Sequence, residues 1–229
     1  MPYKTNESAE NIVLEPAAAA DAAVIWLHGL GADGRDFVPI VEELRLPPTL
    51  AVRFIFPHAR ARPVTINNGF VMRAWYDITG LGPGSAEDEA GIRESGDVVR
   101  RYIEEENARG IASERIVIAG FSQGGAIALS AALRHPQRLA GVMALSTYLP
   151  LRDSLAAEAS PANRDVPILM CHGLRDQMVP ATLGKASRDM LQGLGYQVEW
   201  QAYPMEHSVC MEEVLDISKW LQARLTRNL

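Results

Sequence analysis

Apolar residues gather in short runs that are hydrophobic at nearly every position rather than at every second one. Such runs are typical of strands buried on both faces, as in a mostly parallel sheet. Strands are therefore predicted over residues 22–28, 50–56, 115–119, 139–146 and 166–172. A further strand is predicted over 197–203, and a short edge strand over 12–16 that Pro16 ends.

Helical patterns separate these strands. Apolar residues recur with helical spacing over residues 37–44, 86–109, 123–133, 179–194 and 208–225. Strands that alternate with helices predict an α/β fold whose sheet is covered by helices on both faces. Because no repeat or linker divides the chain, residues 1–229 are expected to form one domain, with a poorly ordered segment over residues 1–10. Loop-like sequence is expected over 58–86 and over 150–165.

Composition narrows the possible partners. The chain has 229 residues, of which 48% are hydrophobic, enough for the core of one α/β domain. With 22 basic against 28 acidic residues its net charge is −6, and no basic cluster exceeds two adjacent residues, which argues against nucleic acid as a partner. No run approaches the roughly 20 apolar residues of a membrane-spanning helix, so no stable membrane insertion is expected. Cys171 and Cys210 fit a reduced, cytoplasmic protein, and neither has the spacing of a metal site.

The first candidate for chemistry is the pattern Gly120-x-Ser122-x-Gly124 between a predicted strand and a predicted helix. A serine on such a turn is held exposed at the carboxyl edge of a sheet, where it can act as a nucleophile. Glycines two residues before and after it avoid a clash in the tight turn. The alternative is a glycine-rich turn with an incidental serine, and an acid and a histidine further along the chain decide between the two.

A competing motif, G-x-G-x-x-G, lies at residues 29–34 directly after a strand, as in dinucleotide-binding proteins. That fold expects an acidic residue at the tip of the second strand, but the strand here ends at Phe56 and is followed by Pro57 and His58. The same loop instead fits one that donates a backbone N–H to an oxyanion. An oxidoreductase that binds a dinucleotide is therefore the weaker alternative.

His207 is the best candidate for the base, since it lies between the last strand and the last helix. His135 lies 13 residues along the helix that begins at Ser122, about 20 Å away, and cannot reach it. His172 ends a strand and is expected to order the loop that follows. A chain order of serine, acid and histidine is typical of an α/β-hydrolase triad.

The acid of that triad is predicted to be Asp176, in the loop after the strand that ends at His172. Asp153, Glu158 and Asp165 lie in loop-like sequence, but none directly follows a strand. Glu206 adjoins His207, and neighbouring side chains normally point apart. A carboxylate is needed to fix the imidazole tautomer and to stabilise its cation.

Taken together, these residues resemble the bacterial carboxylesterases and acyl-protein thioesterases of the α/β-hydrolase superfamily. The resemblance rests on His28-Gly-Leu-Gly31, Pro63-Val-Thr-Ile-Asn67 with Arg73-Ala-Trp-Tyr-Asp77, Gly120-Phe-Ser-Gln-Gly-Gly125, His172-Gly-x-x-Asp176-x-x-Val-Pro180 and His207. It implies that Ser122 is the nucleophile, His207 the base and Asp176 its partner. It also implies an oxyanion hole formed by the backbone N–H groups of Leu30 and Gln123.

The same resemblance implies substrate contacts from Trp75, Leu30, Met178 and Val179, no metal or organic cofactor, and a possible homodimer. The leading expectation is a serine carboxylesterase that hydrolyses short- to medium-chain acyl esters through an acyl-enzyme. The alternative is an acyl-protein thioesterase or lysophospholipase with the same triad. A non-catalytic binding module that kept the fold is the alternative from another class.

Overall fold

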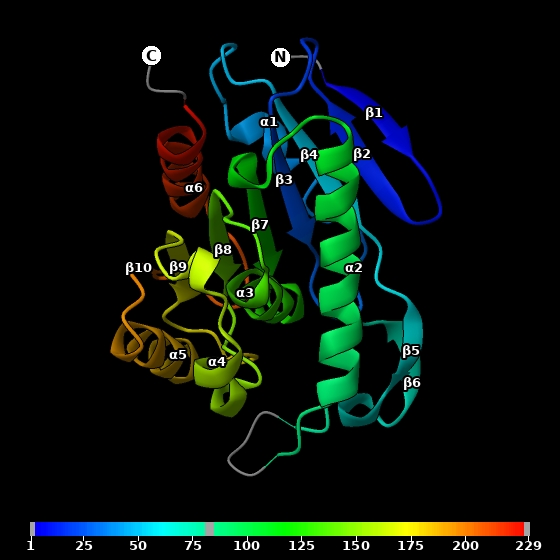
Figure 1. The fold of residues 1–229 in the computed structure, drawn as a ribbon. Coiled ribbons are helices and arrows are strands. Elements are labelled where there is room, and N and C mark those ends of the chain that lie inside the picture. Colours follow the sequence, from blue (N-terminus) through cyan, green and yellow to red (C-terminus); the bar gives the residue numbers. More distant parts are fainter. Residues whose placement is uncertain (1–2, 81–84, 227–229) are drawn as a thin grey trace.

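A computed structural model describes residues 3–80 and 85–226, in which one large sheet runs through the molecule between helices (Figure 1). Its strand order is β1-β2-β4-β3-β7-β8-β9-β10. The strands are β1 (Lys4–Glu7), β2 (Asn11–Glu15), β3 (Ala22–Leu27), β4 (Val52–Pro57), β7 (Ile116–Phe121), β8 (Gly141–Leu145), β9 (Ile168–Gly173) and β10 (Val198–Tyr203). From β4 to β10 every neighbouring pair is parallel, whereas β2 pairs antiparallel with β1 and β4. The predicted mostly parallel sheet is confirmed.

Two hydrophobic cores lie on opposite faces of this sheet. The helices are α1 (Ile40–Glu43), α2 (Glu89–Ala108), α3 (Gln123–Arg134), α4 (Arg152–Glu158), α5 (Ala181–Gly193) and α6 (Met211–Leu225). One core joins the sheet to α2, α3, α4 and α5, and the other joins it to α1 and α6. In β3, Ile25 belongs to the first core and Trp26 to the second. Such strands are apolar throughout because both of their faces are covered.

The N-terminal segment differs from expectation. Residues 4–7 form β1, where a poorly ordered segment was expected, and β2 lies between β1 and β4 rather than at the edge. All four side chains of β1 are exposed, so the strand is held by backbone pairing with β2 and has no apolar pattern to reveal it. Residues 1 and 2 lie outside the described part of the chain.

Two regions expected as loops contain regular structure. Residues 58–86 include a hairpin of β5 (Ala61–Val64) and β6 (Phe70–Arg73), which turns at Asn68 and Gly69, both with positive φ. Residues 81–84 of that expected loop lie outside the described residues. The segment 150–165 carries α4 and a 3-10 turn. Both strands of the hairpin are short, and Val64 is their only buried residue, so no buried face marks them in the sequence.

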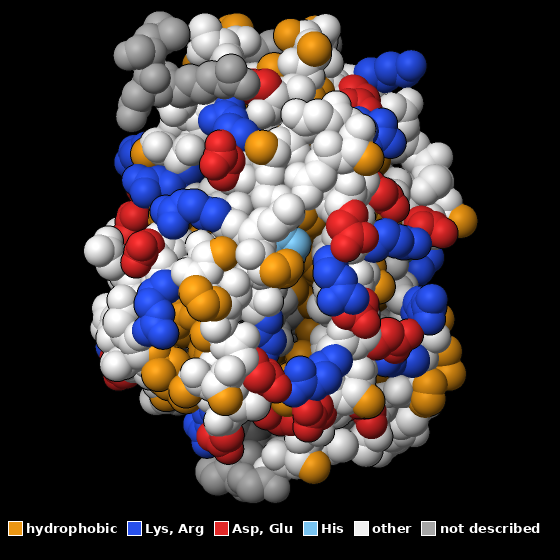
Figure 2. Space-filling view, in the orientation of Figure 1, with side chains coloured by type: hydrophobic (Ala, Val, Ile, Leu, Met, Phe, Trp, Pro, Cys, Tyr) orange, Lys and Arg blue, Asp and Glu red, His pale blue; other side chains and the backbone are white. Residues whose placement is uncertain are grey.

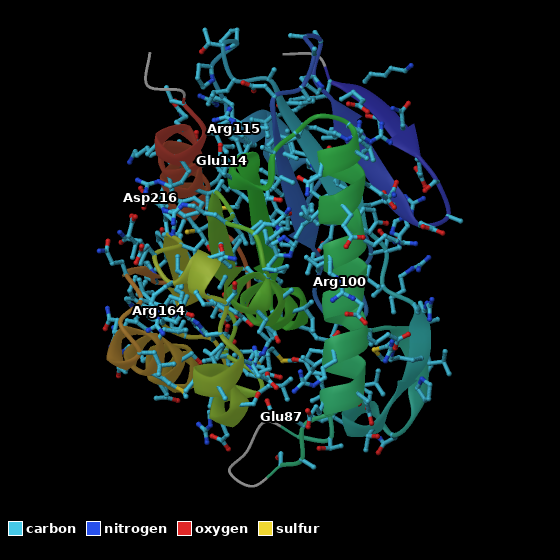
Figure 3. All side chains as sticks on the ribbon, viewed as in Figure 1. Glu87, Arg100, Glu114, Arg115, Arg164 and Asp216 are labelled. Carbon is cyan, nitrogen blue, oxygen red and sulfur yellow. The ribbon has the colours of Figure 1, made fainter. Side chains whose placement is uncertain are left out.

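Arg115, labelled in Figure 3, lies at the start of β7, at the edge of the sheet opposite the carboxyl ends of the strands, where it connects three elements. Its guanidinium donates to the Asp21 carboxylate at 3.2 Å and to the Leu225 carbonyl at 2.7 Å. The start of β3, the start of β7 and the end of α6 are thereby held together. In the described residues, no helix combines the length and apolarity needed to cross a membrane.

Candidate active site

The turn between β7 and α3 has the geometry that Gly120-x-Ser122-x-Gly124 predicts. Ser122 has φ 54° and ψ −121°, a backbone conformation that L-residues rarely adopt. A Cβ on Gly120 would lie 2.2 Å from the Gly124 carbonyl oxygen, and one on Gly124 would lie 2.4 Å from the Leu27 carbonyl oxygen. Neither position has room for a side chain, so both glycines are required by the close approach of β7, α3 and β3.

Three polar side chains meet at the carboxyl edge of the sheet. His207 Nε2 lies 2.9 Å from Ser122 Oγ, and His207 Nδ1 lies 2.7 Å from Asp176 Oδ2. The carboxylate accepts a hydrogen bond from the Nδ1–H group of His207. Nε2 is then unprotonated and can accept a hydrogen bond from the serine hydroxyl. The structure thus brings together the serine, histidine and acid that the sequence selected, from the loops after β7, β10 and β9.

Asp176 is fixed by its own loop. Its second oxygen, Oδ1, accepts the backbone N–H groups of Met178 at 2.9 Å and Val179 at 2.8 Å. The side chain is fully buried, so these hydrogen bonds replace the water that a carboxylate would otherwise bind.

Other candidates for base and acid are engaged in structural contacts. His172 is buried and bonds through Nε2 to the Val179 carbonyl at 2.8 Å, which orders the acid loop. Burial lowers the pKa of His172, which keeps this imidazole neutral. Glu158 is bonded to Arg93 and Arg134, and these hydrogen bonds lower its pKa to about 2. Glu206 is exposed beside His207.

The loop after β3 lies directly beside the serine. A Cβ on Gly29 would lie 3.5 Å from the Ser122 Cβ. Within the part of the chain that the structure describes, the backbone N–H of Leu30 and that of Gln123 donate to no other residue, whereas the neighbouring Gly31 N–H donates to the Arg73 carbonyl. Two amides without an internal acceptor are what the predicted oxyanion hole requires.

The dinucleotide alternative finds no support in this loop. A fingerprint of that kind places its phosphate at the N-terminus of a helix that the glycines open. Here α1 begins only at Ile40. Gly34 is required for another reason, because its Cβ would lie 2.5 Å from the Phe56 carbonyl oxygen.

The residues expected to contact substrate separate into two groups. Met178 is 68% exposed and Leu30 is half-buried, so both offer surface near the triad. Trp75 and Val179 are buried, at 2% and 4% exposure, so they present little surface, and their contact with substrate stays a prediction. A cavity of about 410 Å³ does touch Trp75, but it lies between α2 and the β5–β6 hairpin, and no triad residue lines it.

Two polar contacts of Gln123 had no signal in the sequence. Its Oε1 accepts the backbone N–H of Trp75 at 2.8 Å, and its Nε2 donates to the Tyr76 carbonyl at 2.7 Å. The motif pattern leaves this position free, and only the fold brings residue 75 next to residue 123.

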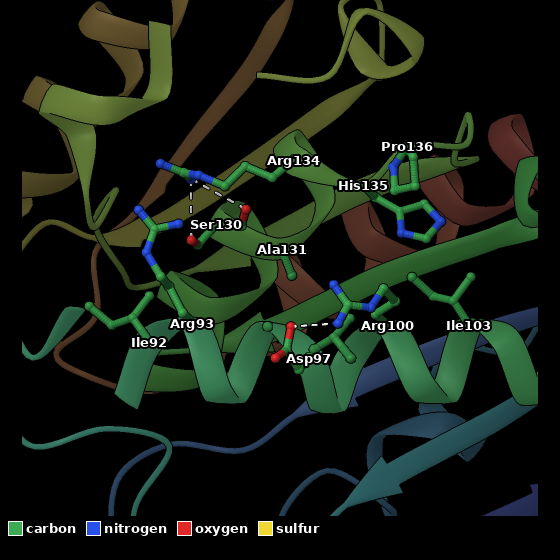
Figure 4. A pocket seen from close by; sticks show the side chains of 12 residues that line it. Ile92, Arg93, Asp97, Arg100, Ile103, Ser130, Ala131, Arg134, His135 and Pro136 are labelled. Atoms are coloured by element: carbon green, nitrogen blue, oxygen red, sulfur yellow. Dashed lines mark hydrogen bonds and ion pairs between the residues drawn. The ribbon is translucent and has the colours of Figure 1, made fainter. Parts of the chain in front are cut away.

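A separate cleft lies between α2 and α3 (Figure 4). It has a volume of about 320 Å³ and is lined by Arg93, Arg100 and Arg134. Each of these arginines is already paired with a carboxylate, as Arg100 is with Asp97 at 2.8 Å. Basic and acidic side chains are intermixed over the surrounding face of the molecule (Figure 2), so no field of one sign forms there. The cleft shares no residue with the triad.

Comparison with known proteins adds to this geometry. Residues 8–225 match the phospholipase/carboxylesterase family. This chain belongs to that family. The acyl-protein thioesterase 1 of Neurospora crassa is 43% identical over 94% of this chain and 92% of the relative. The acyl-protein thioesterase 1 of Gibberella zeae is 40% identical over 93% of this chain and 95% of the relative.

Solved structures agree with the family assignment. Arabidopsis thaliana SOBER1 superimposes with a TM-score of 0.85 at 35% identity, over 90% of this chain and 99% of the other. Acyl-protein thioesterase 2 of Zea mays gives a TM-score of 0.85 at 31% identity, over 94% of this chain and 99% of the other. The α/β-hydrolase fold is confirmed, and the chain is a serine hydrolase with esterase or thioesterase activity.

Proposed function

We propose that this protein is an acyl-protein thioesterase in which Ser122 is the nucleophile, His207 the general base and Asp176 its partner. The observation that carries the proposal is the continuous chain of hydrogen bonds from Ser122 Oγ through His207 to Asp176, at 2.9 and 2.7 Å. Curated relatives at about 40% identity favour thioester hydrolysis over the carboxylesterase activity expected first.

Acylation begins when Ser122 Oγ attacks the thioester carbonyl and its proton moves to His207 Nε2. The tetrahedral oxyanion is stabilised by the backbone N–H groups of Leu30 and Gln123, which are already oriented before the reaction. Asp176 stabilises the imidazolium without taking its proton. The C–S bond then breaks, and His207 returns the proton to the departing thiolate.

In deacylation water takes the place of Ser122 as the nucleophile, and Ser122 becomes the leaving group. His207 Nε2 takes a proton from water, the hydroxide attacks the acyl-serine, and the released Ser122 oxygen recovers the proton as the carboxylic acid leaves. Because an alkyl thiol has a pKa near 8.5, a thiolate needs little protonation in order to leave. The site therefore requires no metal ion to activate the leaving group.

Met178 and Leu30 are proposed to contact the substrate, because they offer apolar surface near the triad. Trp75 and Val179 lie beneath that surface. The cytoplasmic location stays a prediction of the sequence, and a possible homodimer stays what the family resemblance implies. Both cysteines are free in the structure.

The proposal is tested with a matched pair of peptides that carry the same acyl chain on cysteine or on serine. The purified protein should release the acyl group faster from the thioester, and Ser122→Ala should lose about 10⁴-fold or more in kcat. Ser130→Ala removes another buried hydroxyl, on α3, and is expected to keep normal turnover. Unchanged turnover in Ser122→Ala would refute the assignment, and faster release from a lysophospholipid would favour lysophospholipase action.

A further inference from the structure

Trp75 joins two parts of the candidate site that are far apart in the sequence. Its indole N–H donates to the His28 carbonyl at 2.9 Å. Its backbone N–H donates to Gln123 Oε1 at 2.8 Å. One buried residue therefore bonds to the loop after β3 and to the first residue of α3.

One of these partners lies close in the chain to the first amide of the proposed oxyanion hole, and the other carries the second amide. The His28 carbonyl lies two residues before Leu30, and Gln123 supplies its own backbone N–H. The spacing between the two amides depends on how β3 and β7 end, and Trp75 is bonded to the chain at both ends. Trp75 holds the His28 side through its indole ring and the Gln123 side through its backbone N–H, and these two bonds limit how far the amides can move apart.

The His28 side of this connection is itself immobilised. Its Nε2 accepts the Ala59 N–H at 3.0 Å, so Nδ1 carries the proton and donates to the Gly29 carbonyl at 2.7 Å. Burial lowers the pKa of His28 to about 4, and the neutral ring that this pattern needs is maintained at neutral pH. The imidazole packs against the indole, with 5.2 Å between the ring centroids of His28 and Trp75.

The Gln123 side is held in the same way. Gln123 Nε2 donates to the Tyr76 carbonyl at 2.7 Å, so its amide group bonds to two consecutive residues of one segment. The Ser95 hydroxyl of α2 donates to the Trp75 carbonyl. Trp75, Gln123 and Ser95 are all buried, and water cannot compete for these bonds.

We infer that Trp75 is a positioning residue that sets the separation of the Leu30 and Gln123 amides and so determines how well they bind the tetrahedral oxyanion. The inference rests on the proposed function and assigns Trp75 a role beneath the site instead of in a substrate pocket. Loss of one oxyanion donor typically costs 10²–10³ in kcat. Misplacement without loss should cost less, about 10- to 100-fold, and should leave ground-state binding nearly unchanged.

The test compares Trp75→Phe with Trp220→Phe, which makes the same change at a residue of similar burial, 4% exposed, on α6. The indole N–H of Trp220 has no hydrogen-bond partner in the described part of the chain, so its removal breaks no bond there. Each variant is assayed for kcat and KM, and for the Ki of a trifluoromethyl ketone, which adds to Ser122 and places an anionic oxygen in the oxyanion hole.

We expect Trp75→Phe to lower kcat about 10- to 100-fold, to raise Ki by a similar factor and to leave KM within about twofold. Trp220→Phe should keep all three values. Ser95→Ala removes only the hydroxyl that holds the Trp75 carbonyl. It should also lower kcat and raise Ki, by smaller factors than Trp75→Phe. It provides the measurement if Trp75→Phe fails to fold.

Wild-type kcat and Ki in Trp75→Phe, or a fall in kcat at unchanged Ki, would overturn the inference while Ser122→Ala still abolished turnover. If Ser122→Ala instead keeps turnover, the proposed function fails, and the positioning role is judged by hydrogen exchange. Faster exchange of the Leu30 and Gln123 amides in folded Trp75→Phe than in wild type then supports the inference. Equal exchange overturns it.

Discussion

Glu213 is a fully buried carboxyl in the first turn of α6, outside the candidate site. It lies beside the Cys171 thiol, yet neither carboxyl oxygen receives a hydrogen bond of ordinary geometry from the described residues. Burial raises its pKa to about 8. Glu213 is therefore protonated in the folded protein at neutral pH and ionised in the unfolded chain.

Because its folded pKa lies above the unfolded value of 4.5, Glu213 makes the free energy of unfolding fall as pH rises from about 4.5 to about 8. Glu213→Gln replaces the carboxyl with an amide that does not ionise, so this decrease in the free energy of unfolding should disappear. The variant should exceed wild type in stability by an amount that grows by roughly 2–3 kcal/mol between pH 6 and pH 9. Urea unfolding at both pH values measures it, with exposed Glu212→Gln as the control. A gain independent of pH would show that Glu213 is ionised in the folded state.

At the level of single residues, a catalytic role could be predicted from the sequence where the type of side chain and its order along the chain both point to it. Ser122, Asp176 and His207 follow three strands whose carboxyl ends meet at one edge, so their approach could be predicted. Trp75 could not be assigned in this way, because an aromatic residue in a long loop fits a pocket wall and a buried support equally well. The two bonds it makes depend on contacts 47 and 48 residues apart.

Among the elements, the end of β9 lies against the loop that carries His207, at Gly173. A Cβ there would lie 2.3 Å from the Glu206 carbonyl oxygen and 2.6 Å from that of Met205. Gly173→Ala must therefore push the loop away and move His207 relative to Ser122. A displacement of about 1 Å is enough to reduce kcat by about 10²-fold.

We expect Gly173→Ala to lower kcat to that extent. Gly96→Ala is the control, because no atom lies within 4 Å of a Cβ at this position in α2. It should stabilise the protein by about 0.5–1 kcal/mol and leave kcat unchanged. Steady-state kinetics and thermal melts of both variants give the comparison. Normal kcat in folded Gly173→Ala would mean that the loop adapts without moving His207.

Prediction of the elements succeeded where burial dictates the pattern. The parallel strands are apolar on both faces, and the long helices each have one apolar face, so both could be recognised. The strands β1, β5 and β6 are short and largely exposed, and α4 has seven residues. Pairing and local turns hold these elements, and neither leaves a hydrophobic period in the sequence.

In the whole molecule, four of the five histidines have a pKa that burial lowers: His28, His58, His135 and His172. Each of them therefore binds a proton less readily in the folded protein than in the unfolded chain. The histidines should therefore make the free energy of unfolding fall as pH is lowered from about 7 to 5. Glu213 acts in the opposite direction, because it releases about one proton on unfolding, and this reduces the net proton uptake. Calorimetry at pH 5.5 should detect net proton uptake on unfolding, and proton release there would contradict this prediction.

The left-handed backbone of Ser122 has a consequence for how this protein can change. A glycine at position 122 would adopt φ 54° without strain and should make the fold more stable, yet it would remove the hydroxyl that faces His207. Selection for stability and selection for turnover therefore favour different residues at the same position. A lineage released from the need to catalyse would be expected to lose its serine there early, while Gly120 and Gly124 persisted because the packing of β7 and α3 still required them.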